Sequence, residues 1–121
     1  MIDTVRVRPN DVATGEQELY FKRLVIKPGS RTVVKDGREK HLTATEFDLL
    51  YFLASHPGQV FTREELMRLV WDYSIPMDCS TVTVHIRRLR EKVEGYPSRP
   101  AYIKTVWGVG YKFETLEVLS L

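Results

Sequence analysis

The order of apolar and polar residues along the chain predicts three helices and two groups of strands. The clearest helical segment spans residues 80–94, where Val82, Ile86, Leu89 and Val93 recur at spacings of three or four. With about 100° of rotation per residue, these side chains form one narrow apolar stripe that a helix would bury. The rest of the segment is polar or charged, so this helix is the first place to look for a functional surface.

The polar side of this predicted helix has the chemistry of a surface that reads DNA. On a helical wheel Thr81, Val84, Arg88 and Lys92 fall on one flank of the apolar stripe, with His85 beside them. Arginine can donate two hydrogen bonds to a guanine edge, threonine can bond to either partner of a base pair, and an aliphatic side chain can pack on a thymine methyl group. The alternative is an ordinary surface helix with solvated charges and one exposed valine.

Two shorter helices are predicted before this segment, and each starts with a capping box. The pairs Thr43/Glu46 and Thr62/Glu65 have the spacing at which side chains and backbone satisfy each other's hydrogen bonds at a helix start. Pro57-Gly58 ends the first helix. The side chains expected to face the core are Phe47, Leu50, Tyr51 and Ala54 in the first helix, and Leu66, Leu69 and Val70 in the second.

Strand-forming residues lie near both ends of the chain. Residues 19–26, 31–35 and 38–42 predict an antiparallel sheet, with Asp36-Gly37 as a two-residue hairpin turn. Residues 102–106 and 111–114 predict a terminal hairpin. We attribute the Gly-x-Gly of its tip, at Gly108 and Gly110, to the positive φ angles that such a turn requires.

The predicted order is sheet, helix, helix, loop, helix and hairpin. This order predicts an α+β winged helix-turn-helix, with an N-terminal antiparallel sheet, three helices and a C-terminal β-hairpin wing. In that arrangement the third helix enters the major groove of DNA. We expect residues 1–17 to be a flexible linker, residues 18–116 to form the domain, and residues 117–121 to be a tail.

The composition narrows the class of protein further. The chain has 121 residues and a formal net charge of only +2, but basic residues dominate from Asp78 to Lys112 and acidic ones from Thr43 to Asp72. One basic face on a nearly neutral domain suits a polyanion partner.

No apolar run approaches the roughly 20 residues of a membrane span, and no signal peptide opens the chain. With Cys79 as the only cysteine, we expect a reduced, cytoplasmic setting with no disulfide.

Three motifs, taken in order, resemble the OmpR/PhoB-type DNA-binding domain of bacterial two-component response regulators. They are Leu-Thr-Ala-Thr-Glu-Phe-Asp-Leu-Leu from Leu42, Val-His-Ile-Arg-Arg-Leu-Arg-Glu-Lys from Val84, and Ile-Lys-Thr-Val-Trp-Gly-Val-Gly-Tyr from Ile103. The resemblance implies an effector domain that binds double-stranded DNA at tandem half-sites. It also implies an upstream phosphorylatable receiver domain, absent from this chain, and RNA polymerase as a partner of the loop 71–79. We expect a monomer in isolation.

The resemblance also assigns roles to individual residues. Thr81, Val84 and Arg88 match positions that contact bases, in agreement with the helical wheel. The predicted contacts to the sugar-phosphate backbone are Trp71, Ser80, His85, Arg87, Arg90, Lys92, Thr105 and Tyr111, and the predicted wing residues are Lys104, Trp107 and Lys112.

This chain departs from the family pattern at three positions. Ser80 replaces a frequent phosphate-binding Arg, Thr83 replaces a frequent Asp, and Trp107 replaces an Arg that often enters the minor groove. Trp107 cannot supply that cation and could instead pack against a sugar or a neighbouring protomer.

Two other classes of function are less well supported. A winged helix can bind a protein partner, but protein interfaces favour aromatic residues and deplete Lys, whereas the exposed side of the third helix is cationic with no aromatic residue. An enzyme would need a grouped set of catalytic or metal-binding side chains. His41, His56 and His85 lie in different elements, so we predict no catalysis, no metal and no cofactor. Cys79 could act as a redox-sensitive thiol beside the third helix, and the alternative is an unreactive loop thiol.

Overall fold

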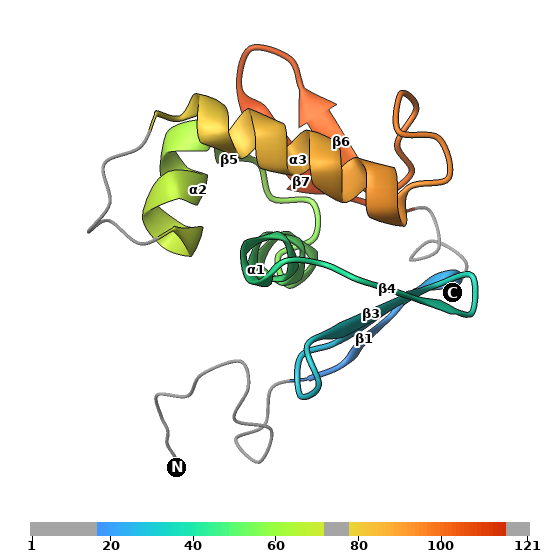
Figure 1. Ribbon diagram of the computed structural model, residues 1–121. Helices are drawn as coiled ribbons and strands as arrows, with labels where there is room; N and C mark the ends of the chain where they lie inside the picture. The colour runs from blue at the N-terminus through green and yellow to red at the C-terminus, as the bar shows by residue number, and fades with distance from the viewer. Residues whose placement is uncertain (1–16, 72–77, 116–121) are drawn as a thin grey trace. The chain divides into compact units, whose positions relative to one another are not determined.

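The computed structural model describes residues 17–71 and 78–115. The predicted linker 1–17 (apart from its last residue), most of the loop 71–79, and the predicted tail 117–121 lie outside these residues. The chain divides into two compact units, residues 1–41 and 42–121, and each is described by itself. The elements of both units are labelled in Figure 1.

The first unit contains a four-stranded antiparallel sheet. Its strands are β1 (Leu19–Tyr20), β2 (Leu24–Lys27), β3 (Thr32–Lys35) and β4 (Arg38–Lys40), arranged in chain order. The single strand expected over residues 19–26 is wrong, because a tight turn at residues 21–23 folds β1 back onto β2. The Phe21 N–H donates to the Leu24 carbonyl at 2.8 Å and closes this turn.

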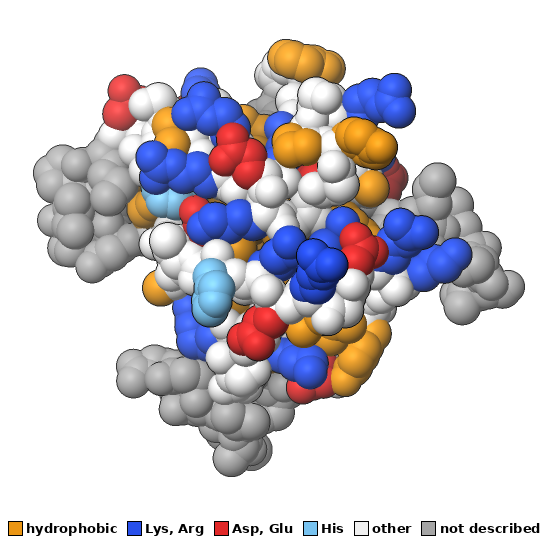
Figure 2. All heavy atoms as spheres, turned by 45° about the vertical axis from the view of Figure 1, so that its right-hand side comes forward, with side chains coloured by type: hydrophobic (Ala, Val, Ile, Leu, Met, Phe, Trp, Pro, Cys, Tyr) orange, Lys and Arg blue, Asp and Glu red, His pale blue; other side chains and the backbone are white. Residues whose placement is uncertain are grey.

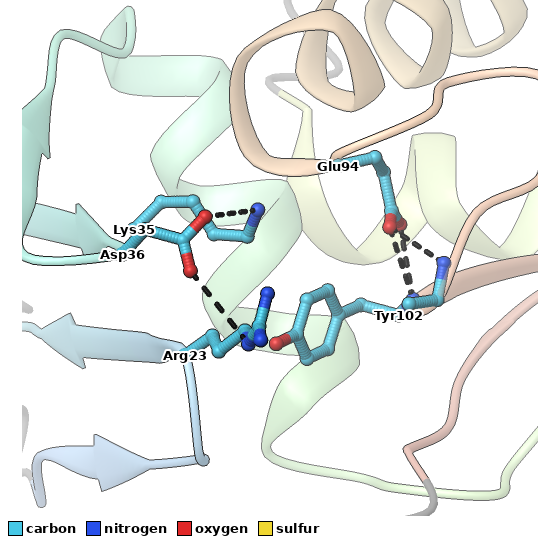
Figure 3. A network of polar contacts seen from close by, with 6 residues as sticks. Arg23, Lys35, Asp36, Glu94 and Tyr102 are labelled. Carbon is cyan, nitrogen blue, oxygen red and sulfur yellow. Dashed lines mark hydrogen bonds and ion pairs between the residues drawn. The ribbon is translucent and has the colours of Figure 1, made fainter.

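The turn between β3 and β4 confirms the Asp36-Gly37 prediction. Both residues have positive φ, 53° and 77°, as a type I′ hairpin turn requires. The Asp36 carboxylate lies 3.1 Å from the Lys35 ammonium and 3.9 Å from Arg23 Nε, as the left part of Figure 3 shows. The turn therefore joins three charged side chains of this unit.

The second unit holds the three helices described in the structure. They are α1 (Ala44–Ala54), α2 (Arg63–Val70) and α3 (Ser80–Val93), and every two of them are in contact. Both predicted capping boxes are confirmed. The Glu46 and Glu65 N–H groups donate to the threonine hydroxyls at 3.2 and 3.0 Å, and the Thr43 and Thr62 N–H groups donate to the glutamate carboxylates at 3.0 and 2.8 Å.

A three-stranded sheet completes the second unit, in the order β5-β7-β6. The strands are β5 (Phe61–Thr62), β6 (Ile103–Val106) and β7 (Gly110–Phe113), so the predicted terminal hairpin is present, with ends shifted by one residue. The sequence analysis missed β5, which pairs with β7 and leads directly into α2. Two residues are too few to show a strand periodicity.

Glycine is required at position 110 for a reason other than the positive φ that we predicted. Only Gly108 of the two tip glycines has a positive φ, at 78°. At Gly110 a Cβ atom would lie 1.9 Å from the Phe61 carbonyl oxygen and 2.9 Å from Thr62 Cα. Glycine is needed there because the β5 backbone passes too close for any side chain.

The core of the second unit is made of the apolar faces of its elements. Phe47, Leu50 and Ala54 are buried as predicted, and Tyr51 is half-buried. In α2, however, Leu69 is 50% exposed, so its predicted core position is wrong, and Met67 is buried instead. At 100° per residue, Leu66, Met67 and Val70 share one side of α2 and Leu69 lies at its edge.

Among the described residues, no helix is long and apolar enough to cross a membrane.

Candidate nucleic-acid interface

The third helix buries the predicted stripe and exposes two arginines. Val82, Ile86, Leu89 and Val93 are at most 1% exposed, which confirms the apolar face. Arg87 and Arg88 are exposed, and Thr81 and Val84 are half-buried. The positions that we expected to contact bases thus lie on or beside the solvent-facing side of α3.

The first turn of α3 is capped from the preceding residues. The Asp78 carboxylate accepts the Ser80 N–H at 3.0 Å, which places a negative charge at the positive end of the helix dipole. Cys79 is the half-buried N-cap residue and makes no side-chain cap bond. Ser80 itself is exposed. Its hydroxyl therefore lies at the start of α3, where we expected a contact to the DNA backbone.

His85 and Trp71 form a small aromatic cluster on one flank of α3. The two rings pack edge to face, with centroids 5.1 Å apart. His85 Nδ1 lies 2.8 Å from the Thr81 carbonyl. Because a carbonyl oxygen only accepts hydrogen bonds, Nδ1 carries the proton. The hydrogen bond orients the imidazole, and the ring contact brings together two residues that we expected to contact the backbone of DNA.

Lys92 is held by a buried carboxylate of α1. Its ammonium lies 2.6 Å from Glu46 Oε1, and the Glu46 side chain is only 2% exposed. Burial opposes ionisation of Glu46, but hydrogen bonds from Lys92 and Thr43 and the charges of Lys92 and His85 outweigh it and lower the pKa of the carboxyl group. Lys92 therefore joins α3 to α1, and its contact to DNA stays a prediction.

Arg90 joins α3 to the hairpin wing. Its Nε and Nη2 atoms donate to the Ile103 carbonyl at 3.1 and 2.8 Å, and Nη2 also donates to Thr105 Oγ1 at 2.8 Å. The guanidinium lies 5.8 Å from the centre of the Tyr111 ring. Partial burial lowers the pKa of Arg90, with Tyr111 and Glu94 opposing the change. An arginine remains charged at neutral pH, so Arg90 is a cation that cross-links helix and wing.

Glu94 is the most important residue that the sequence analysis missed. It follows α3 directly, is 6% exposed, and accepts the N–H groups of Ala101 at 2.6 Å, Tyr102 at 3.1 Å and Ile103 at 2.8 Å. The right part of Figure 3 shows its carboxylate directed at Tyr102. A carboxylate at the C-terminal, negative end of a helix dipole is unfavourable unless hydrogen-bond donors compensate it. An acidic residue at the end of a predicted helix was therefore the sequence feature that could have pointed to Glu94.

Arg90 and Glu94 together form what we call the wing clamp. They hold the outer edge of β6 through both polar groups of the Ile103 backbone, the carbonyl through Arg90 and the N–H through Glu94. An unpaired sheet edge needs such cover, since its backbone groups otherwise lack partners. The clamp fixes the wing relative to α3.

The wing carries cations on its strands and an aromatic residue at its tip. Lys104 and Lys112 lie directly opposite each other, and Lys112 is 3.4 Å from Glu114. Trp107 is 89% exposed. Figure 1 shows the turn between β6 and β7 projecting beyond the side of α3. Trp107 is thus the predicted site residue that lies farthest from the clamp along the hairpin.

A groove of about 430 Å³ lies between α3 and the wing. It is lined by Thr83, Ile86, Arg87, Arg90, Glu91, Pro97, Ser98 and Tyr111. Arg63, at the start of α2, adds a cation at the margin of this groove, with its Nη1 atom 3.5 Å from Thr83 Oγ1. The sequence analysis gave Arg63 no role. The groove thus carries two of the predicted backbone-contacting arginines and one predicted tyrosine.

The arrangement favours an anionic partner over a catalytic reaction. Figure 2 shows one face of the molecule with Lys and Arg side chains spread across it and fewer acidic ones between them. Within residues 17–71 and 78–115, no group of three or more His, Cys, Asp or Glu side chains could hold a metal ion. Cations on an exposed helix beside a clamped hairpin can contact phosphates and base edges.

The sequence and the fold of the chain are similar to those of several known proteins. Residues 37–113 match the family described as "Transcriptional regulatory protein, C terminal". The chain is 48% identical over 94 residues to the uncharacterized transcriptional regulatory protein YcbL of Bacillus subtilis (strain 168), a match that covers 78% of this chain and 42% of YcbL.

Two of the similar solved structures each match about four fifths of this chain. The response regulator DrrB, a Thermotoga maritima OmpR/PhoB homolog, has a TM-score of 0.76 and 41% identity, covering 80% of this chain and 44% of DrrB. The Klebsiella pneumoniae RstA DNA-binding domain, in complex with the RstA box, has a TM-score of 0.68 and 34% identity, covering 82% of this chain and 98% of that domain. The chain spans less than half the length of YcbL and DrrB.

Proposed function

Because the chain belongs to the OmpR/PhoB-type family of transcriptional regulatory C-terminal domains, we propose that it binds double-stranded DNA sequence-specifically and regulates transcription. The observation that carries this proposal is the exposed side of α3, where Arg87 and Arg88 face solvent on a helix that the wing clamp joins to a cationic hairpin. In a winged helix-turn-helix this helix lies in the major groove.

The residues of α3 have distinct roles in this proposal. Arg88 reads a guanine edge, while Thr81 and Val84 refine the choice of base pair. Ser80, His85 and Arg87 contact phosphates from α3, and Trp71 and Tyr111 do so from its two sides. Contacts to phosphates fix the register of the protein on the duplex but carry no sequence information.

Several features of the longer regulator belong to the proposal as well. We infer that a phosphorylatable receiver domain controls this effector domain in a two-component system, that two copies bind tandem half-sites, and that the loop 71–79 contacts RNA polymerase. These inferences rest on family resemblance. The free effector domain is a monomer, and the setting is the cytoplasm, where DNA is available.

A protein-binding winged helix is the competing function. The exposed side of α3 argues against it, because this side is cationic and carries no aromatic residue, whereas protein interfaces favour aromatic residues and deplete Lys. The family consists of transcription regulators, which is not an enzyme class, and we propose no catalytic activity.

The first test is selection of a preferred sequence from random duplex DNA, followed by titration with variants at two salt concentrations. Arg88→Ala should lose about 1–3 kcal/mol of binding free energy on the preferred duplex and relax the preference at one base pair. Arg87→Ala should weaken all duplexes by a similar factor and reduce the salt dependence. Arg38→Ala, an exposed cation of β4, serves as the control for loss of charge.

Binding without any sequence preference would contradict the proposal. If no sequence is enriched, and binding by the wild-type protein disappears as salt rises, the basic surface is only an electrostatic patch. The protein-partner function would then take precedence.

A further inference from the structure

The imidazole ring of His85 is held in one protonation pattern by its own helix. Its Nδ1 atom lies 2.8 Å from the Thr81 carbonyl, which can only accept a hydrogen bond, so the proton of a neutral ring lies on Nδ1. The other nitrogen, Nε2, then carries a lone pair and no proton. Among the described residues Nε2 has no hydrogen-bond partner, and the side chain is only half-buried. Neutral His85 therefore offers a partner outside the fold an acceptor and no donor.

This pattern conflicts with the phosphate contact that we propose for His85. A phosphate oxygen of DNA is also an acceptor, so a neutral ring would direct one lone pair at another. The contact needs a second proton on the ring, because both nitrogens of an imidazolium are donors. An imidazole in an ordinary environment changes its charge between about pH 5 and 8, so the charged ring is present only in part of this range.

The charges around His85 leave an imidazolium without a counter-charge of its own in the free domain. From α1, the Glu46 carboxylate attracts a charged ring, and this attraction helps to lower the pKa of Glu46. The Lys92 ammonium, 2.6 Å from the same carboxylate, offsets that attraction. Arg88, three residues further along α3, adds a like charge, and Trp71 at the end of α2 packs on the ring but is uncharged. A DNA phosphate would supply the missing negative charge.

We propose that DNA binding by this domain takes up one proton, at Nε2 of His85, so that affinity for DNA falls as the pH rises. This inference rests on the proposed function and adds a form of regulation at the same surface. The proton comes from solvent and forms the N–H group that donates to the phosphate, and no other covalent bond forms or breaks. Hydrogen bonds from a charged donor to phosphate are stronger than neutral ones. At acidic pH, where the free ring is already charged, no proton is taken up and affinity is level.

The first test titrates the preferred duplex with wild type and His85→Gln from about pH 5.5 to 8.5, at constant ionic strength. Wild-type affinity should fall by about 10-fold or more between about pH 6 and 8, and by no more than about tenfold per pH unit, because one proton is involved. Glutamine carries an N–H donor that does not titrate, so the profile of His85→Gln should be much flatter.

His56 provides the matched control because its ring is held in the same way. Its Nδ1 atom lies 2.8 Å from the Phe52 carbonyl, four residues earlier in the chain. His56 follows α1 and is not among the residues that we propose contact DNA, so His56→Gln should keep the wild-type pH profile. Parallel profiles of wild type and His85→Gln would overturn the inference, as would a profile that His56→Gln flattens.

Calorimetry counts the proton directly and needs no variant. The heat of binding, measured at about pH 7.5 in two buffers with different ionisation enthalpies, gives the number of protons taken up per bound domain. We expect about one proton for the wild type and nearly none for His85→Gln. No uptake by the wild type, or equal uptake by both proteins, would overturn the inference.

These outcomes are distinct from a failure of the proposed function. If the wild type selects a duplex sequence and Arg88→Ala weakens binding, but the wild-type pH profile equals that of His85→Gln, only the further inference fails. If no duplex sequence is preferred at any pH, the proposed function fails, and the inference that rests on it is overturned as well.

Discussion

Gly110 is constrained by its neighbour rather than by its own backbone angles. The β5 backbone lies where its side chain would be, with the Phe61 carbonyl oxygen 1.9 Å from the Cβ position. A neighbour of this kind cannot be predicted from local sequence, because Phe61 and Gly110 come together only in the folded sheet. The sequence does predict a glycine turn, as Gly108 confirms.

We therefore expect Gly110→Ala to lower the free energy of unfolding by about 1–3 kcal/mol or more, since the clash is with backbone that must move. Denaturant titration measures this change. Gly95→Ala is the matched control, because no atom lies within 4 Å of its Cβ position and its φ is not positive. It should remain within about 0.5 kcal/mol of wild type. Equal effects of the two substitutions would contradict the close-approach explanation.

At the scale of elements, the wing clamp connects α3, the helix that we propose reads DNA, to the hairpin beside it. Glu94 accepts three backbone N–H groups, and an amide in its place would present an NH₂ group to one of them. Buried donors without acceptors are destabilising, and hydrogen bonds to charged groups are stronger than neutral ones. The clamp is thus expected to be sensitive to the charge of Glu94 and not only to its shape.

For Glu94→Gln we expect a loss of stability of about 1–3 kcal/mol and faster hydrogen exchange at the amides of Ala101, Tyr102 and Ile103. DNA affinity should fall by a similar factor on all duplexes, with base preference unchanged, because α3 itself keeps its residues. Glu91→Gln, an exposed position one turn earlier on α3, is the control. Wild-type exchange at these three amides in the Glu94 variant would rule out the clamp.

How well each element was predicted depends on where its stabilising contacts lie. The helix boundaries, both capping boxes and the apolar stripe of α3 follow from residues a few positions apart, and the sequence predicted them. The strand β5 and the role of Glu94 depend on residues distant in the chain, and the sequence did not predict them. The predicted core position of Leu69 is wrong for a local reason, because this residue lies at the edge of the apolar side of α2. Similarly, the sequence analysis predicted Arg90 and Lys92 as contacts to the DNA backbone but could not reveal their partners within the fold, Ile103 and Glu46.

At the scale of the whole molecule, Glu46 makes global stability depend on pH. Its pKa is lowered in the folded protein, whereas the pKa of an unfolded Glu is about 4.3. Between these two values the unfolded state binds more protons at Glu46, so the contribution of Glu46 to stability rises with pH across this window and is level above it. The contribution is fully present above the unfolded value and is lost as the pH falls through the folded one.

Glu46→Gln should therefore be less stable than wild type at neutral pH and should show a shallower loss of stability as the solution is acidified. Thermal unfolding followed by circular dichroism over an acidic pH series measures both effects. Glu39→Gln, on an exposed position of β4, should keep the wild-type profile. A Glu46→Gln profile parallel to that of wild type would show that this carboxyl group does not carry the pH dependence.

The pairing of β5 with β7 also bears on the order in which the protein folds during synthesis. Phe61 pairs with Tyr111, so 50 residues separate the partners (111 − 61), whereas each strand pair of the first sheet is linked by a short local turn. Contacts between distant residues form late, because a long loop must close first. The ribosome will therefore have released the whole first sheet and all three helices before the wing can dock, and the surface that we propose reads DNA is assembled last.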